Sequence, residues 1–319
     1  MGVVFLGTSE FAAGVLERLA ASTSHRPALV LTRPDRPRGR GRRLASPPVA
    51  ERSRALGLAL EQPQRINDPA ARALIGAGPQ TVVVCAFGAL IKEPLLSEHE
   101  LLNVHPSLLP RWRGAAPVER AIMAGDAETG VSIMRLTAGL DSGPVCLAGS
   151  EPIGAEDTYG TLSERLQPLA GALLLETLDR KAEDQPLPFA EQDDAAATYA
   201  EKIEPRDRLL DPAHTAVELE RRVRALDPHV GTHVALADGT LLGVHRAAVA
   251  EASPSGADPP GDDARRRGDT RAAAGVRASG ERLLLDCREG VLELLVVQPP
   301  GGRAMDAASY LRGHRVSGA

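Results

Sequence analysis

Hydrophobic and polar residues in the N-terminal part of the chain alternate between short apolar runs and stretches with helical spacing. Residues 3–6 form an apolar run that ends at a Gly-Thr-Ser turn, residues 10–21 carry apolar side chains on one helical face, and residues 28–32 form a second apolar run. Such runs are typical of buried strands, and the middle stretch is typical of an amphipathic helix. The order predicts a Rossmann-like α/β fold with a doubly wound, mostly parallel sheet.

The same alternation continues along the chain. Residues 81–86, TVVVCA, are the most strand-like segment and are predicted to be central in the sheet, and residues 101–105 end another buried strand. The loops that follow these two strands are predicted at the carboxyl edge of the sheet, where open α/β sheets bind ligands. The other predicted elements are helices over residues 46–56 (Ser46 as N-cap, Pro47 at N1), 116–124 and 158–181, and strands over residues 130–136 and 144–148.

The pattern changes after residue 189. Residues 190–206 are polar and aperiodic, and they predict a linker between a domain over residues 1–189 and a domain over residues 207–319. In the second domain a helix over residues 213–226 precedes several short strands without intervening helices, which predicts a small OB-like β-barrel. The predicted strands are residues 231–236, 241–248, 283–286 and 291–297, with Asp238-Gly239 as a hairpin turn, and residues 251–282 are predicted to be a mobile excursion.

Composition and charge add one local feature. The 319 residues are 43% hydrophobic and 25% charged, which fits two globular domains, and the net charge of -5 argues weakly against a nucleic-acid partner. Yet residues 33–54 contain eight arginines against only Asp35 and Glu51. The arginine loop (residues 32–48) is therefore either a solvated basic loop or a surface for phosphates.

Cysteine usage and the N-terminus suggest a compartment. The three cysteines, Cys85, Cys146 and Cys287, form no C-x-x-C pair, which fits a reducing environment. The N-terminus has no basic region typical of a secretory leader, and no apolar run approaches the ~20 residues that span a bilayer. We therefore expect a cytoplasmic protein without membrane association.

Candidate chemistry lies at the end of the strand over residues 101–105. Side chains alternate along a strand, so Asn103 and His105 are predicted to point to the same side, as an amide donor beside a titratable ring. Asp141 follows later between Gly139 and Gly143. Taken singly, Asn103 could end a strand, His105 could be a core histidine and Asp141 could form a turn.

Other classes of site have less support. The sequence has no G-x-S-x-G elbow, no cysteine beside a base, and no His or Cys spacing typical of a metal site, so no metal is expected. The first turn reads GTSEFAAG and lacks the G-x-G-x-x-G fingerprint, which argues against a nicotinamide dehydrogenase.

Several motifs together resemble one family. The segments FLGTSEFAA, RPDRPRGRGRRL, NVHPSLLPRWRGAAP, AGDAETGVSIM, GLDSG, IGAEDTYGTL, YAEKI and QPPGGRAMDAASYLRGHR resemble those of methionyl-tRNA formyltransferases. The resemblance covers nearly the whole chain except residues 251–282. Two positions depart from the family pattern, because Phe87 stands where tyrosine is frequent and Asp227-Pro228-His229 stands where P-W-P is frequent.

The resemblance implies a reaction and a set of residues. It implies formyl transfer from 10-formyltetrahydrofolate to the α-amine of methionyl initiator tRNA, by a monomer in which Asn103 and His105 stabilise the formyl oxygen and Asp141 accepts the amine proton. The implied folate pocket comprises Ser107, Leu108, Leu109, Pro110, Phe87, Gly88 and Leu90. The implied tRNA-binding residues are Arg36, Arg38, Arg40, Arg42 and Arg43, supported by the second domain.

Two alternatives stay open beside this interpretation. A formyltransferase acting on a sugar amine or another small amine would keep the same three polar residues but would not need the arginine loop. A catalytically silent tRNA-binding module would not need Asn103, His105 and Asp141 at all.

Overall fold

The computed structural model describes residues 2–38, 43–76, 81–250, 275–314 and 316. The chain folds into two compact units. The first comprises Met1–Ala121, Asp126–Gly154 and Thr161–Lys202, and the second comprises Ile122–Gly125, Ala155–Gly160 and Ile203–Ala319. Within the described residues, no helix has the length and apolar character needed to cross a membrane.

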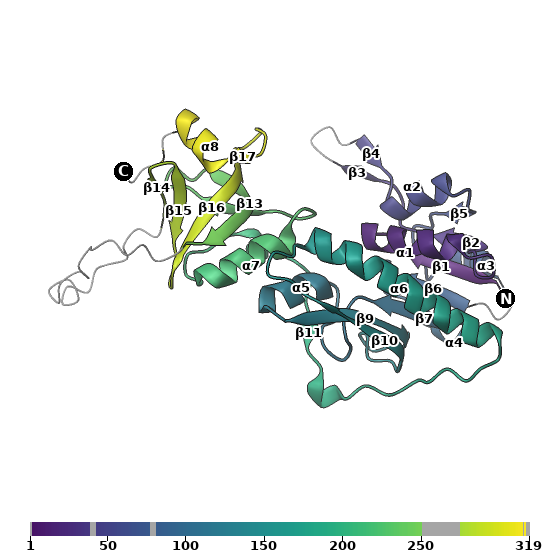
Figure 1. Cartoon of the computed structure of the whole chain (residues 1–319). Helices are drawn as coiled ribbons and strands as arrows, with labels where there is room; N and C mark the ends of the chain where they lie inside the picture. Colours follow the sequence, from purple (N-terminus) through teal and green to yellow (C-terminus); the bar gives the residue numbers. More distant parts are fainter. Residues whose placement is uncertain (1, 39–42, 77–80, 251–274, 315, 317–319) are drawn as a thin grey trace. The chain divides into compact units, whose positions relative to one another are not determined.

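A seven-stranded mixed sheet forms the centre of the first unit (Figure 1). Its spatial order is β10 (Val145–Pro152), β9 (Glu128–Arg135), β7 (Glu100–His105), β6 (Thr81–Cys85), β1 (Val3–Gly7), β2 (Leu29–Leu31) and β5 (Leu60–Glu61). The five strands from β7 to β5 are parallel, and β9 and β10 are antiparallel to their neighbours. The doubly wound, mostly parallel prediction is confirmed, with β6 in the middle of the sheet.

Helices cover this sheet because its strands are apolar on both faces. The helices are α1 (Glu10–Ala21), α2 (Pro48–Ala55), α3 (Pro69–Ile75), α4 (Leu95–Glu98), α5 (Pro117–Ala124) and α6 (Tyr159–Ala182). On one face, Val4 and Val82 pack in a cluster with Ile75 of α3 and Leu95 of α4. The side chain of Ser9 accepts a hydrogen bond from the backbone of Ala12 and caps α1, so the strand-turn-helix signal at the start was correct.

The structure adds one element to the arginine loop and corrects one prediction next to it. The loop contains a short antiparallel hairpin, in which β3 (Arg36–Arg38) pairs with β4 (Arg43–Ala45). The prediction of a helix start at Ser46 was wrong by one residue, because Pro47 is the N-cap of α2 and Pro48 is its first residue. Both prolines suit a helix start, since the lost N–H has no partner within the helix there.

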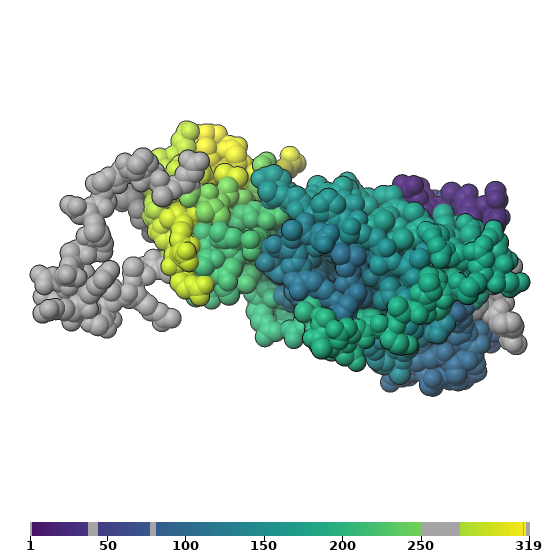
Figure 2. All heavy atoms as spheres, turned by 60° about the horizontal axis from the view of Figure 1, so that its bottom comes forward, coloured from purple at the N-terminus to yellow at the C-terminus, as the bar shows by residue number. Residues whose placement is uncertain are grey.

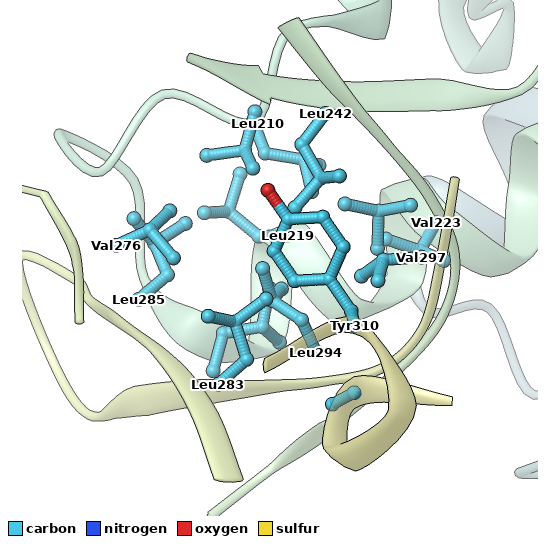
Figure 3. Close-up of a cluster of buried hydrophobic side chains, with 14 of the residues drawn as sticks. Leu210, Leu219, Val223, Leu242, Val276, Leu283, Leu285, Leu294, Val297 and Tyr310 are labelled. Atoms are coloured by element: carbon cyan, nitrogen blue, oxygen red, sulfur yellow. The ribbon is translucent and has the colours of Figure 1, made fainter. Parts of the chain in front are cut away.

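The second unit is an open, curled antiparallel sheet, which confirms the predicted class as a half-barrel (Figure 1). Its order is β12 (Thr232–Ala235), β13 (Leu241–Val249), β16 (Val291–Gln298), β15 (Arg282–Asp286) and β14 (Val276–Ser279), with β17 (Met305–Asp306) paired to β16. Helices α7 (Ala216–Leu226) and α8 (Ala307–Gly313) enclose its apolar face, and Tyr310 of α8 points into the cluster with Leu219, Leu242 and Leu294 (Figure 3). A capping box between Thr215 and Glu218 begins α7.

The structure adds elements that the sequence pattern did not reveal in this unit. β14 lies inside the stretch predicted as a mobile excursion and pairs with β15, whereas residues 251–274 lie outside the described residues. β17 and α8 were not predicted. In the segment Asp227-Pro228-His229, which departs from the family pattern, the ring of His229 stacks on Tyr159 with 3.6 Å between ring centroids.

The stretch predicted as a linker makes ordered contacts with the first unit. It contains the 3-10 helix η1 (Asp194–Ala196) and the short strand β11 (Tyr199–Ala200), and the 3-10 helix η2 (Pro205–Arg208) of the second unit begins at its end. β11 pairs in parallel with β8 (Arg113–Gly114), which belongs to the loop after β7. Residues after α6 therefore return to the segment that follows the candidate residues Asn103 and His105 (Figure 1).

Candidate active site

Strand β7 places Asn103 and His105 at the carboxyl edge of the sheet. In its register Asn103 lies between Val84 of β6 and Met134 of β9, and His105 is the last residue of the strand. Both side chains are polar groups in a buried position, with 7% and 4% of the residue surface exposed. Strand periodicity puts both on one side, as predicted.

Asp141 joins these two side chains from the loop between β9 and β10. Its Oδ1 accepts a hydrogen bond from Asn103 Nδ2 at 3.3 Å, and its Oδ2 lies 3.7 Å from His105 Nδ1. The loop turns sharply here, because Asp141 has a left-handed φ of 45° and a Cβ at Gly143 would lie 2.0 Å from the carbonyl oxygen of Arg135. The structure thus brings the polar trio (Asn103, His105 and Asp141) together.

Backbone groups of the loop after β7 form hydrogen bonds with His105 and Asp141. His105 Nε2 lies 2.9 Å from the carbonyl oxygen of Trp112, which can only accept, so Nε2 carries a hydrogen. The backbone N–H of Gly114 donates to Asp141 Oδ2 at 2.9 Å. His105 Nδ1 is therefore the ring nitrogen that remains for a substrate, on the side of the Asp141 carboxylate.

Buried hydroxyls hold the shape of the same loop. Ser107 is fully buried and its Oγ donates to the carbonyl of Arg111 at 2.6 Å. Ser132 Oγ donates to the carbonyl of Ser107 at 2.8 Å and accepts from the N–H of Leu109 at 3.1 Å. The hydroxyl of Ser107 thus supports the loop, and contacts of residues 107–110 with a folate stay a prediction.

An ion pair fixes the exposed side of this loop. Arg111 donates to both carboxylate oxygens of Asp126, at 2.8 and 2.6 Å, and Trp112 Nε1 donates to the same carboxylate at 2.8 Å. The guanidinium also lies over the Trp112 ring. The hydrogen bonds to Asp126 raise the pKa of Arg111.

Two pockets lie beside the loop that follows β6. A pocket of about 510 Å³ is lined by Thr8, Arg33, Phe87 and Gly88 together with prolines of the arginine loop. A second pocket of about 280 Å³ shares Arg33 and Phe87 and includes Leu90, which is 67% exposed. The predicted folate residues therefore fall into two groups, since Phe87, Gly88 and Leu90 line these pockets and residues 107–110 do not.

Arg33 connects the two pockets. Its Nη1 donates to the carbonyl of Gly88 at 2.7 Å, and its buried Nε has no hydrogen-bond partner among the residues that the structure describes. Thr8 Oγ1 donates to the carbonyl of Phe87 at 2.9 Å from the other side. These bonds define the position of the loop after β6, which sequence reasoning assigned to the pocket without identifying its supports.

A network around Asp35 anchors the arginine loop. Its carboxylate accepts from Gln62 Nε2 at 2.8 Å and from Ser46 Oγ at 3.1 Å, and Arg54 donates to both partners. Hydrogen bonding from Gln62, followed by Ser46, lowers the pKa of Asp35. Of the five predicted tRNA-binding residues, Arg36 is exposed in β3, Arg38 and Arg43 pair through their backbones, and Arg40 and Arg42 lie outside the described residues.

The sequence pattern did not predict that residues far along the chain from Asp141 form hydrogen bonds to its loop. Gln192 Nε2 donates to the carbonyls of Asp141 and Gly143, and its Oε1 accepts from Arg113. Gln192 lies in the aperiodic stretch EQDDAAA, which has no pattern that marks it. Among the residues that the structure describes, no three His, Cys, Asp or Glu side chains gather as a possible metal site.

Comparison with known proteins gives the family. The "Formyl transferase" family model matches residues 1–178, and the "Formyl transferase, C-terminal domain" model matches residues 202–315. A methionyl-tRNA formyltransferase of Methylococcus capsulatus is 41% identical over 321 residues, covering 100% of this chain and 98% of that protein. A methionyl-tRNA formyltransferase of Dinoroseobacter shibae is 40% identical and covers 98% of this chain and 97% of its own.

Solved structures share the fold at low identity. HypX from Aquifex aeolicus in complex with tetrahydrofolic acid matches 98% of this chain and 47% of its own, with a TM-score of 0.61 and 17% identity. An N-formyltransferase from Helicobacter canadensis, in complex with folinic acid and dTDP-3-aminofucose, matches 92% of this chain and 98% of its own, with a TM-score of 0.63 and 12% identity. The resemblance found in the sequence motifs is confirmed: the chain belongs to the methionyl-tRNA formyltransferase family of formyl-transferring enzymes.

Proposed function

We propose that this chain transfers the formyl group of 10-formyltetrahydrofolate to the α-amine of methionine esterified to initiator tRNA. The observation that carries the proposal is the convergence of the Asn103 amide, the His105 ring and the Asp141 carboxylate at the carboxyl edge of β7. This set provides hydrogen-bond donors and one base, which is what an amine needs to attack a formyl group. The names of the relatives supply the substrate.

The reaction can be written around these three side chains. The amine lone pair forms a bond to the formyl carbon, and the carbonyl electrons move to the formyl oxygen. One hydrogen of the Asn103 amide is directed at Asp141, which leaves the second for that oxygen, and a protonated His105 Nδ1 supplies another donor. Removing one such donor typically slows turnover by about 10²–10³.

Proton transfer completes the exchange. The attacking nitrogen loses one hydrogen as the new C–N bond forms, and Asp141 accepts it directly or through a water. The C–N10 bond of the folate then breaks, and N10 gains the hydrogen that the amine lost, returned by Asp141 directly or through a water, so Asp141 ends as a carboxylate. The charges balance without a covalent intermediate on the enzyme.

The arginine loop and the second unit favour an RNA acceptor over a small amine. Arg36 is exposed on the hairpin beside the larger pocket, and the Asp35 network fixes the base of that hairpin. Arginines bind phosphates, and such contacts weaken as salt rises. We place tRNA binding in this loop and in the half-barrel, and a tRNA substrate places the reaction in the cytoplasm. A monomer stays a prediction.

A direct assay tests the proposal. Radiolabelled 10-formyltetrahydrofolate is offered with charged initiator tRNA, charged elongator tRNA or a small amine such as an amino sugar. We expect rapid transfer to the first substrate only. Equal transfer to the amino sugar would support the alternative acceptor, and tRNA binding without any transfer would support a silent module.

Replacement of Arg40 separates the two binding roles. Arg40→Ala should raise the KM for charged tRNA and leave that for folate unchanged, because the substitution removes a cation from the arginine loop only. If Arg40→Ala weakened folate alone, the assignment of the arginine loop to tRNA would be wrong.

A further inference from the structure

Gln192 holds the backbone turn that presents Asp141. Its amide nitrogen donates both hydrogens, one to the carbonyl of Asp141 at 2.8 Å and one to the carbonyl of Gly143 at 2.6 Å. The first carbonyl belongs to the residue whose φ is left-handed, a conformation that non-glycine residues adopt at a cost, and the second lies two residues later in the same turn. The side chain of Gln192 therefore stabilises the turn at its least favourable point.

The same side chain is held in turn by Arg113. Gln192 Oε1 accepts from Arg113 Nε at 2.9 Å, and Arg113 Nη2 donates to Asp194 at 2.7 Å. Arg113 is only 3% exposed, so its guanidinium is fixed in place and its loss of water is offset by these bonds. The donor and acceptor ends of the Gln192 amide are thus both assigned, which determines its orientation.

Arg113 belongs to the segment that contacts the trio directly. The preceding residue, Trp112, accepts from His105 through its carbonyl, and the following residue, Gly114, donates to Asp141. The segment also pairs with β11, and a Cβ at Gly114 would lie 2.7 Å from the carbonyl oxygen of Ala200. Residues 192–200 therefore support both the Asp141 turn and the segment that positions His105.

Figure 2 shows this neighbourhood from the lower side of Figure 1, where the surface of the segment after β7 and that of residues after α6 lie next to each other. The side chains of Gln192, Arg113 and Asp194, which we call the Gln192 brace, join the loop between β9 and β10 to the segment after β7 and to the residues after α6. The brace reaches the trio at the Asp141 carbonyl, on the backbone of that residue and away from its carboxylate.

We propose that Gln192 is a positioning residue for formyl transfer, which fixes the Asp141 carboxylate relative to His105 and Asn103. The inference rests on the proposed function, because it assigns Asp141 a part in the chemical step. Displacement of a catalytic group by about 1 Å can cost on the order of 10²-fold in rate. A residue of this kind lowers kcat when it is replaced and leaves substrate affinity nearly unchanged.

Gln192→Glu is the sharpest test. The carboxylate keeps the size of the side chain and the bond from Arg113, but it cannot donate to the carbonyls of Asp141 and Gly143. We expect kcat to fall about 10- to 100-fold, with KM for both substrates within about twofold of the original values. Gln192→Met, which has similar volume and no charge, should show the same loss if the donated bonds are responsible.

Two controls separate positioning from damage to the fold. Gln185→Glu makes the same chemical change at an exposed glutamine of the polar stretch after α6, whose side chain donates to Glu183, and it should keep the original kcat. In an Asp141→Ala background, Gln192→Glu should cause no further loss beyond about threefold, because the group that it positions is gone. A purely structural role would give a loss that multiplies with that of Asp141→Ala.

The outcomes are distinguishable. An original kcat in both Gln192→Glu and Gln192→Met, with Asp141→Ala inactive, would overturn the positioning role and leave the proposed function intact. A fully multiplicative loss in the double variant would also overturn it. Full activity of Asp141→Ala, or no transfer to charged tRNA by the unmodified chain, would overturn the proposed function and this inference with it.

Discussion

Replacing Asp141 by Asn would test the charge of the trio with little change in shape. Asp141 accepts from Asn103 through one oxygen and from the Gly114 N–H through the other. An amide has only one oxygen, so one of these two donors would face an NH₂ group. The substitution also removes the negative charge next to the ring of His105.

The distance between the Asp141 carboxylate and the His105 ring determines how much the rate should fall. Asp141 Oδ2 lies 3.7 Å from His105 Nδ1, and the side chains are only 13% and 5% exposed. At this separation the attraction between the carboxylate and a protonated imidazole is about 1 kcal/mol in bulk water and about 4.5 kcal/mol at an effective dielectric constant near 20. Loss of this attraction in the transition state, together with the lost base, predicts a decrease in the rate of the chemical step of roughly 10²- to 10³-fold.

Single-turnover formylation at saturating enzyme measures this decrease without interference from product release. Asp184→Asn is a matched control, because Asp184 also has a left-handed φ, of 53°, but is exposed at the end of α6. It should keep the original rate. If Asp141→Asn formylated within about threefold of the original rate, the carboxylate charge would have no part in the chemical step, and the role assigned to Asp141 would be wrong.

Three further outcomes follow from other parts of the chain. Asp35→Ala should raise the KM for charged initiator tRNA about 3- to 10-fold and leave the KM for folate unchanged, because the carboxylate that accepts from Gln62 and anchors the arginine loop is lost. A rise in the KM for folate alone would contradict this prediction. Leu294→Ala should lower the free energy of unfolding of the half-barrel by about 2–5 kcal/mol in urea titrations, since the side chain is fully buried, and a loss below about 1 kcal/mol would show a poorly packed core. Burial, and next to it the charge of Arg208, lowers the pKa of His233 from 6.5. The unfolded chain therefore binds the proton at a higher pH than the folded chain, and the free energy of unfolding should fall as pH drops below about 6.5. Between pH 7.5 and 5.5 the urea midpoint of His233→Gln should fall less than that of the original chain, and an equal fall would contradict this role of His233.

The sheet and two of the three members of the polar trio could be predicted because their signals are local. The run TVVVCA is the most strand-like segment of the chain and forms β6, and the two-residue period of a strand puts Asn103 and His105 on one side. Ser9 caps α1 at the predicted start, whereas α7 begins at Ala216, three residues after its predicted start. These features depend on neighbours within a few residues.

The third member and its supports depend on contacts between distant parts of the chain. Asp141 meets Asn103 across 38 residues of sequence, and only the family resemblance connected the two. Gln192 lies in a stretch without periodicity, whose order comes from hydrogen bonds to the Asp141 turn and from pairing with β8. β14 was not predicted because it is short and follows a stretch rich in Arg, Ala and Gly, without the apolar run of a buried strand. It is held as a strand by pairing with β15.

The pairing of β11 with β8 affects when the candidate site can form during synthesis on the ribosome. Asn103, His105 and Asp141 leave the exit tunnel long before Gln192 and Ala200, which complete the hydrogen bonds of their loops. A nascent chain that ends at α6 contains every strand of the large sheet and yet lacks the donors to the Asp141 turn. The site should therefore mature only after residues 192–200 have emerged, and arrested chains that end just before and just after this stretch should differ sharply in activity.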